Sequence, residues 1–178
     1  REGGNRVVDH LVMCGTPNNG SPFGKVDDAR KIINVLTGLA AKFVPALLPL
    51  SAPILFLLNR SKQVTPTLMQ MDPDSSFIRD LNASPDPGIP YTILAGDVEA
   101  YQEPTDALFA KLLAKTGQSV LFDTLFGQKA NDIAVSIDSI TGVGGARANA
   151  PKTSQVACHH LNYFVSQAGQ QALKVVQW

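Results

Sequence analysis

The sequence has no surplus of either charge sign and very few cysteines. Its 178 residues include 15 basic and 15 acidic side chains, so the formal net charge at pH 7 is zero. This balance argues against a nucleic-acid partner, because phosphate binding draws on a clustered basic surplus. The two cysteines, Cys14 and Cys158, are too few for a disulfide framework or a zinc site. We therefore expect no metal and no cofactor.

A nucleophile elbow is also missing. No serine here stands in a Gly-x-Ser-x-Gly motif, which forms the strand-to-helix turn of the α/β-hydrolases. Ser119 has Gly117 before it but Leu121 where the second glycine belongs, and Ser21 lacks the leading glycine. Cys14 ends an apolar segment, where a cysteine usually behaves as an inert small hydrophobe. We find no defensible nucleophile in these residues.

What the sequence does contain is enough apolar material for a packed core. Hydrophobic residues make up 44% and charged residues 17%, which excludes a disordered tail. The most apolar stretch, Val35 to Leu58, is long enough to cross a bilayer, but Lys42 and three prolines interrupt it. Prolines would leave backbone carbonyls unsatisfied in lipid. Short helices packed over a cleft are therefore favoured over a transmembrane span.

Strand and helix patterns alternate along the chain. Two short apolar runs predict buried parallel strands, Val7 to Gly15 and Tyr91 to Gly96, and Ser154 to Ala157 is expected to be a short third strand. Helical segments lie between and after them: Lys25 to Gly38, Ser61 to Ala83, Thr105 to Lys115 and Ala168 to Val176. Ile133 to Ile140 follows the cap signal Asn131-Asp132 and should begin a helix or a turn. This alternation predicts an α/β fold with a parallel sheet.

The expected strand order also separates the two cysteines. Cys14 and Cys158 would end the first and third strands, with the second strand between them. Two strand spacings amount to ~9.6 Å, whereas a disulfide needs its Cα atoms within ~7 Å. We expect free thiols.

Candidate catalytic groups follow the predicted strands. In an open parallel sheet, ligands bind beyond the carboxyl ends of the strands. His159 and His160 come directly after the third strand, Asp97 directly after the second, and Asp132 after the insertion that follows. His10 lies early in the first strand and is expected to be structural. An acid followed by a histidine is the order of the α/β-hydrolases, although these side chains are equally compatible with helix caps.

Four segments carry a resemblance to bacterial lipases and lipase-like α/β-hydrolases. LVMCGTPNNGSPFG (Leu11 to Gly24) resembles the strand and GTPxxGS loop that follow the nucleophile elbow, and IPYTILAGD (Ile89 to Asp97) resembles the next strand. NDIAVSIDSI (Asn131 to Ile140) is similar to the acid-bearing D-G-x-V-x-x-x-S segment. CHHLNYF (Cys158 to Phe164) resembles the D-H-x-x-Y-F block that carries the catalytic histidine. The four occur in the family's order and cover the chain from end to end.

This resemblance implies the C-terminal part of an α/β-hydrolase fold over 1–178: a parallel sheet with flanking helices and a helical lid insertion at 22–83. The half that carries the nucleophile would lie upstream. The catalytic histidine would be His160 and the acid Asp132. Asp97 is the runner-up acid, because Ile133 stands where the family has glycine.

The implied activity is the hydrolysis of lipid-like or acyl carboxylic esters through a Ser-His-Asp triad, to which these residues supply the histidine and the acid. The expected partners are an ester or lipid-like small molecule and the missing N-terminal half of the domain. Two other readings stay open: a catalytically inactive α/β-hydrolase-like interaction domain, and a membrane-associated segment at Val35 to Leu58.

Two structural expectations follow from this alignment. His160, rather than His159 or His10, should face the cleft, with its Nδ1 ~2.6–3.2 Å from Asp132. The first strand, which would lie beside the missing half, should be covered by that half or by another chain, since an exposed apolar edge invites pairing.

Overall fold

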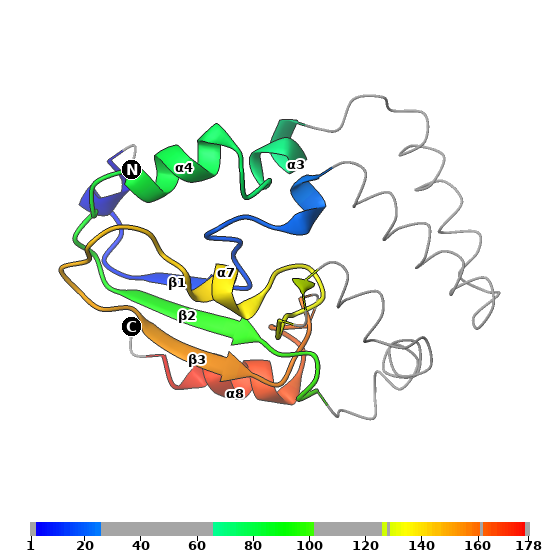
Figure 1. The fold of residues 1–178 in the computed structure, drawn as a ribbon. Helices are drawn as coiled ribbons and strands as arrows, with labels where there is room; N and C mark the ends of the chain where they lie inside the picture. The colour runs from blue at the N-terminus through cyan, green and yellow to red at the C-terminus, as the bar shows by residue number, and fades with distance from the viewer. Residues whose placement is uncertain (1–2, 26–65, 102–125, 128, 161, 177–178) are drawn as a thin grey trace.

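A three-stranded parallel sheet forms the centre of the molecule. The computed structural model describes residues 3–25, 66–101, 126–127, 129–160 and 162–176. The strands are β1 (Leu11–Cys14), β2 (Tyr91–Gly96) and β3 (Lys152–Val156), in the order β1-β2-β3 (Figure 1). Both pairs are parallel. The predicted α/β class and the central place of the second strand are confirmed.

Helices cover both faces of this sheet. Successive side chains of a strand point to opposite faces. Tyr91, Ile93 and Ala95 of β2 therefore share one face, where they form an apolar cluster with α7 (Ile137–Thr141). Leu94 belongs to a second cluster, against which α8 (Gln167–Lys174) packs. Figure 1 shows these two helices on either side of the strands.

Serine side chains begin three of the helices. Ser75 caps α4 (Ser76–Ala83), Ser136 caps α7 and Ser166 caps α8, each accepting a backbone N–H from three residues further on. Such caps satisfy donors that a helix start leaves free. A shorter helix, α3 (Pro66–Gln70), precedes α4, and 3-10 turns lie at Gly4–Arg6 and Pro22–Gly24.

Several element boundaries differ from the predictions. The first strand begins at Leu11 rather than Val7, because the N–H groups of Val7 and Val8 bond to the Gly4 carbonyl in a turn. The third strand runs from Lys152 to Val156, two residues earlier than expected at its start. The last helix starts at Gln167, one residue earlier than predicted, and ends at Lys174, two residues earlier than predicted.

A buried arginine ties the loop before β3 to the start of β2. The guanidinium of Arg147 lies 4.9 Å from the ring centre of Tyr91 and donates to Asp86 at 3.2 Å. The second oxygen of Asp86 accepts the Ala148 N–H at 2.7 Å. This cluster fastens the end of the sheet that is opposite to the candidate catalytic side chains.

The helices predicted within 26–65 and 102–125 lie outside the described residues. This applies to Val35 to Leu58 and to most of the lid expected at 22–83. Of the residues that the structure describes, none belong to a helix that is long and apolar enough to cross a membrane. Cys14 and Cys158 are both free thiols, as expected.

Candidate active site

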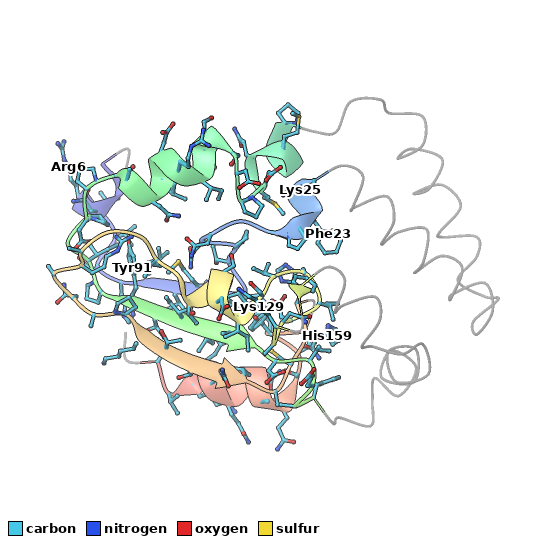
Figure 2. The ribbon with its side chains drawn as sticks, viewed as in Figure 1. Arg6, Phe23, Lys25, Tyr91, Lys129 and His159 are labelled. Carbon is cyan, nitrogen blue, oxygen red and sulfur yellow. The ribbon has the colours of Figure 1, made fainter. Side chains whose placement is uncertain are left out.

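The carboxyl ends of the strands gather the candidate side chains at one edge of the sheet. Figure 2 shows His159 at the end to which the strand arrows point and Tyr91 toward the opposite end. Three segments meet at this edge: the residues after β1, the residues after β2, and the chain that leaves β3. They are joined there by the turn at residues 131–136.

That turn presents Asp132. Asn131 and Ser136 form an antiparallel bridge, and the Asp132 N–H donates to the Val135 carbonyl at 3.0 Å. Ile133 closes the turn with φ 79°, a left-handed conformation that is unfavourable for a β-branched residue. Glycine adopts a positive φ at no steric cost. Ile133 therefore has a backbone conformation that glycine would adopt without strain.

The segment Ile133 to Ile140, which was expected to begin as a helix or a turn, begins as a turn. A positive φ is incompatible with a right-handed helix, so α7 begins only at Ile137, after the Ser136 cap. The N–H groups of Ala134 and Val135 are thereby free to bond to the Asp132 carboxylate.

The carboxylate of Asp132 is completely buried and accepts four hydrogen bonds. Oδ1 accepts the N–H of Ala134 at 3.1 Å and of Val135 at 2.8 Å. Oδ2 lies 2.8 Å from Nδ1 of His160 and accepts the Tyr163 hydroxyl at 2.9 Å. Four donors surround a group that can only accept when ionised, so the arrangement suits a carboxylate anion.

His160 is held from its backbone and from its ring. Its N–H donates to the Asp132 carbonyl at 2.8 Å, while Nδ1 bonds to the carboxylate of the same residue. The hydrogen bond to Asp132 raises the pKa of His160 above its ordinary value; burial opposes this shift and the negative charge of Asp132 adds to it. The side chain keeps 34% of its surface exposed, so the ring is fixed at one nitrogen and open to solvent.

Tyr163 completes the cluster, and sequence reasoning gave it no role. Its hydroxyl accepts the Gly96 N–H at 2.5 Å and donates to Asp132. Burial is the main cause that raises the pKa of Tyr163 far above its ordinary range, so the phenol stays protonated. The tyrosine of the CHHLNYF segment is part of the resembling block and could have been singled out. Its contact with Asp132, however, depends on how the chain turns after His160.

Two glycines make room for these three side chains. A Cβ on Gly15 would lie 2.6 Å from Asp132 Oδ2 and 3.0 Å from His160 Nδ1. A Cβ on Gly96 would lie 2.7 Å from the Tyr163 hydroxyl and 2.9 Å from Cβ of Asp132. The ends of β1 and β2 thus form the floor on which the cluster packs.

The other sequence candidates lie apart from this hydrogen-bonded cluster. Asp97, the runner-up acid, accepts the Glu99 N–H at 3.0 Å and so stabilises its own turn. The ring of His159 is buried and stands edge-on to Tyr101, with 5.3 Å between ring centres. His10 lies before β1 with its Nε2 2.8 Å from the Thr92 hydroxyl. His160 and Asp132 are the pair that the structure brings together.

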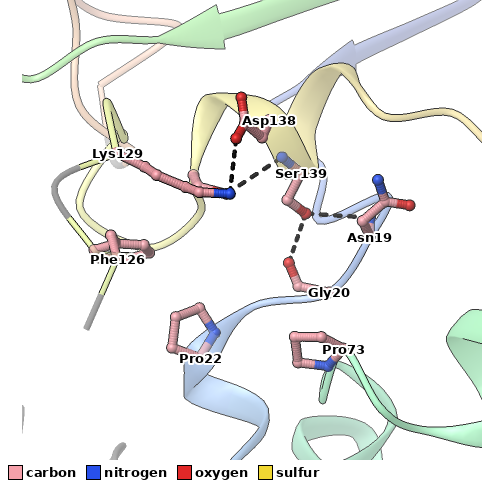
Figure 3. A pocket seen from close by; sticks show the side chains of 9 residues that line it. Asn19, Gly20, Pro22, Pro73, Phe126, Lys129, Asp138 and Ser139 are labelled. Carbon is pink, nitrogen blue, oxygen red and sulfur yellow. Dashed lines mark hydrogen bonds and ion pairs between the residues drawn. The ribbon is translucent and has the colours of Figure 1, made fainter. Parts of the chain in front are cut away.

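A cavity of about 330 Å³ adjoins the turn that carries Asp132 (Figure 3). Its walls combine Pro22, Pro73 and Phe126 with an ion pair of 2.9 Å between Lys129 and Asp138. The buried Ser139 hydroxyl in its wall donates to the Gly20 carbonyl and accepts the Asn19 N–H. Within the described ranges, no three His, Cys, Asp or Glu side chains come together as a metal site would require.

Fold and site together define an α/β protein in which a buried aspartate contacts a partly exposed histidine at the carboxyl ends of a parallel sheet. The family model described as "Domain of unknown function (DUF7379)" matches residues 2–178, and the chain belongs to this family. No curated protein and no solved structure matches the chain significantly.

Proposed function

We propose that this chain is the histidine- and acid-bearing part of a serine hydrolase that cleaves carboxylic esters. The observation that supports it best is the contact of 2.8 Å between His160 Nδ1 and the buried carboxylate of Asp132. A histidine oriented by a carboxylate is the arrangement that activates a serine nucleophile. The order of the four resembling segments supports the same assignment.

The chemistry assigned to His160 follows from which nitrogen is occupied. A carboxylate can only accept, so Nδ1 carries the proton and Nε2 is the basic nitrogen. Nε2 takes the serine proton as the hydroxyl attacks the ester carbonyl and then gives it to the leaving alcohol. Asp132 keeps this tautomer and stabilises the imidazolium that forms. The serine itself belongs, in this proposal, to an elbow that lies N-terminal to Arg1.

The same proposal assigns the chain to one part of a known fold. The chain would be the C-terminal part of an α/β-hydrolase fold, with residues 22–83 as a lid over an acyl-binding cleft. The substrate class is a lipid-like or acyl ester. The parallel sheet with helices on both faces, and the position of His160 directly beyond β3, are compatible with this assignment.

Hydrolysis of p-nitrophenyl esters by the full-length protein tests the proposal. His160→Gln should lower kcat/KM by at least ~10³-fold, because the base is lost. His10→Gln is the matched control, since it changes a histidine at the other end of the sheet, and it should retain activity. Base catalysis needs neutral His160, and its pKa lies above the ordinary 6.5. Wild-type kcat/KM should therefore fall as the pH drops through a value above 6.5.

Equal activity of His160→Gln and the wild type, with both proteins folded, would contradict the proposal. Absence of hydrolysis from the wild type across acyl lengths would favour the alternative of an inactive interaction domain with the same fold.

A further inference from the structure

The Tyr163 hydroxyl links the end of β2 to the carboxylate of Asp132. An amide N–H can only donate, so the phenol oxygen must accept from Gly96, and its own hydrogen is then directed to Asp132 Oδ2. The direction of this hydrogen is fixed by the backbone. Tyr163 is 2% exposed, which keeps water from competing for either bond.

Oδ2 of Asp132 therefore serves two donors at once. His160 Nδ1 and the Tyr163 hydroxyl approach the same oxygen at 2.8 and 2.9 Å, while Oδ1 is occupied by backbone N–H groups. Two donors on one oxygen share its negative charge. Each hydrogen bond is thus weaker than it would be alone, and neither oxygen can rotate away from its partners.

We propose that Tyr163 is a positioning residue that holds the Asp132 carboxylate against His160 and limits how strongly that carboxylate raises the basicity of the imidazole. The catalytic part of this inference rests on the proposed function; the part that concerns the proton affinity of His160 does not. A histidine that binds its proton too tightly would be charged, and hence inactive as a base, near neutral pH.

Among the residues that the structure describes, Asp132 is the charged group that lies against His160 and raises its pKa. Tyr163 itself is next to Asp132 and to the thiol of Cys158, which is completely buried. The ring of Tyr163 also stands edge-on to that of His160, with 6.5 Å between centres. Removing the phenol hydroxyl while keeping the ring isolates the hydrogen bond.

The test is an NMR titration of His160 in the full-length protein and its Tyr163→Phe variant. Loss of the second donor should raise the pKa of His160 by ~0.5 unit or more, because Oδ2 then bonds to the imidazolium alone. Where esters are hydrolysed, the acid limb of the pH profile should move upward by the same amount. At pH 7, kcat should fall more than KM changes.

Tyr91→Phe is the matched control, because Tyr91 is also a buried tyrosine of this fold, and its hydroxyl meets Arg147 at the other end of β2. It should leave the pKa of His160 unchanged. An unchanged or lowered pKa of His160 in folded Tyr163→Phe overturns the inference. The NMR titration needs no substrate, so its result tests the inference about Tyr163 independently of the proposed function.

A second variant covers the case in which Tyr163→Phe does not fold. Incorporation of 3-fluorotyrosine at position 163 keeps the hydroxyl and makes the phenol a stronger donor. The pKa of His160 should then decrease relative to the wild type. An increase, or no change, overturns the inference.

Discussion

At the scale of single residues, the position of the Asp132 carboxylate depends on a backbone conformation that its neighbour adopts against its own preference. Ile133 has φ 79°, and its N–H is held by the Asn131 side chain at 2.8 Å. The left-handed conformation costs an L-residue about 1–2 kcal/mol. In return, the N–H groups of Ala134 and Val135 both reach Asp132 Oδ1. Such strain persists where the surrounding contacts outweigh it.

In a folded protein an alanine variant is usually more stable than the glycine variant at the same position. At Ile133 we expect the opposite order of stability. Ile133→Ala keeps the Cβ, and with it the strain, while it loses the packing of a half-buried side chain. Ile133→Gly loses the same packing but relieves the strain. We expect Ile133→Gly to unfold with a free energy about 1 kcal/mol higher than Ile133→Ala. Chemical denaturation of the two variants measures this difference, and an alanine variant at least as stable as the glycine variant would contradict it.

At the scale of elements, the close approach of β2 to the Asp132 turn depends on a glycine at the end of the strand. A Cβ on Gly96 would lie 2.7 Å from the Tyr163 hydroxyl and 2.9 Å from the Cys158 carbonyl. The second of these is backbone and cannot rotate aside. The strand therefore ends in a residue without a side chain, because Asp132 and Tyr163 occupy that space.

Gly96→Ala should consequently destabilise the protein by about 1–3 kcal/mol, the range for an overpacked core. It should also displace Tyr163 and so change the chemical shifts of the His160 ring. Gly4→Ala is the control, since a Cβ there would meet nothing within 4 Å. Thermal unfolding and NMR spectra of both variants check the prediction, which fails if the two are equally stable.

Some of these elements could be predicted and others could not. The bounds of Tyr91 to Gly96 could be predicted because a strand buried on both faces forms an almost continuous apolar run. The start of α7 at Ile137 could not be predicted, because the sequence leaves a helix and a turn open at Ile133 and isoleucine carries no turn signal. The start of β1 was missed because Val7 and Val8 have strand-forming side chains but bond to a preceding turn.

Residues that directly follow neighbouring parallel strands meet at one edge of the sheet, but Asp132 comes after an insertion that follows β2, so strand order alone does not place it. The contact between His160 and Asp132 could be predicted from the resemblance, which selected the histidine and the acid among the candidates. The contact of Tyr163 with both Gly96 and Asp132 could not, since it depends on the path of the chain between His160 and Ser166. Sequence spacing does not determine such a path.

At the scale of the whole molecule, β1 lies at one side of the three-stranded sheet. In the part of the chain that the structure describes, β1 pairs with β2 alone, and its first residue, Leu11, is 38% exposed. The expectation that the other side of β1 is covered by a further strand stays a prediction. This prediction and the proposed function both rest on a missing N-terminal half, because the strand that leads to a nucleophile elbow would lie beside β1.

Labelling of the full-length protein with a fluorophosphonate, read by intact mass and peptide mapping, tests the central claim most directly. We predict one adduct, on a serine within a Gly-x-Ser-x-Gly sequence, that forms in the wild type and in His10→Gln. Its rate of formation should fall by at least ~10²-fold in His160→Gln, since the serine loses its base. Absence of an adduct from the folded wild-type protein, or an equal rate in His160→Gln, would contradict the account.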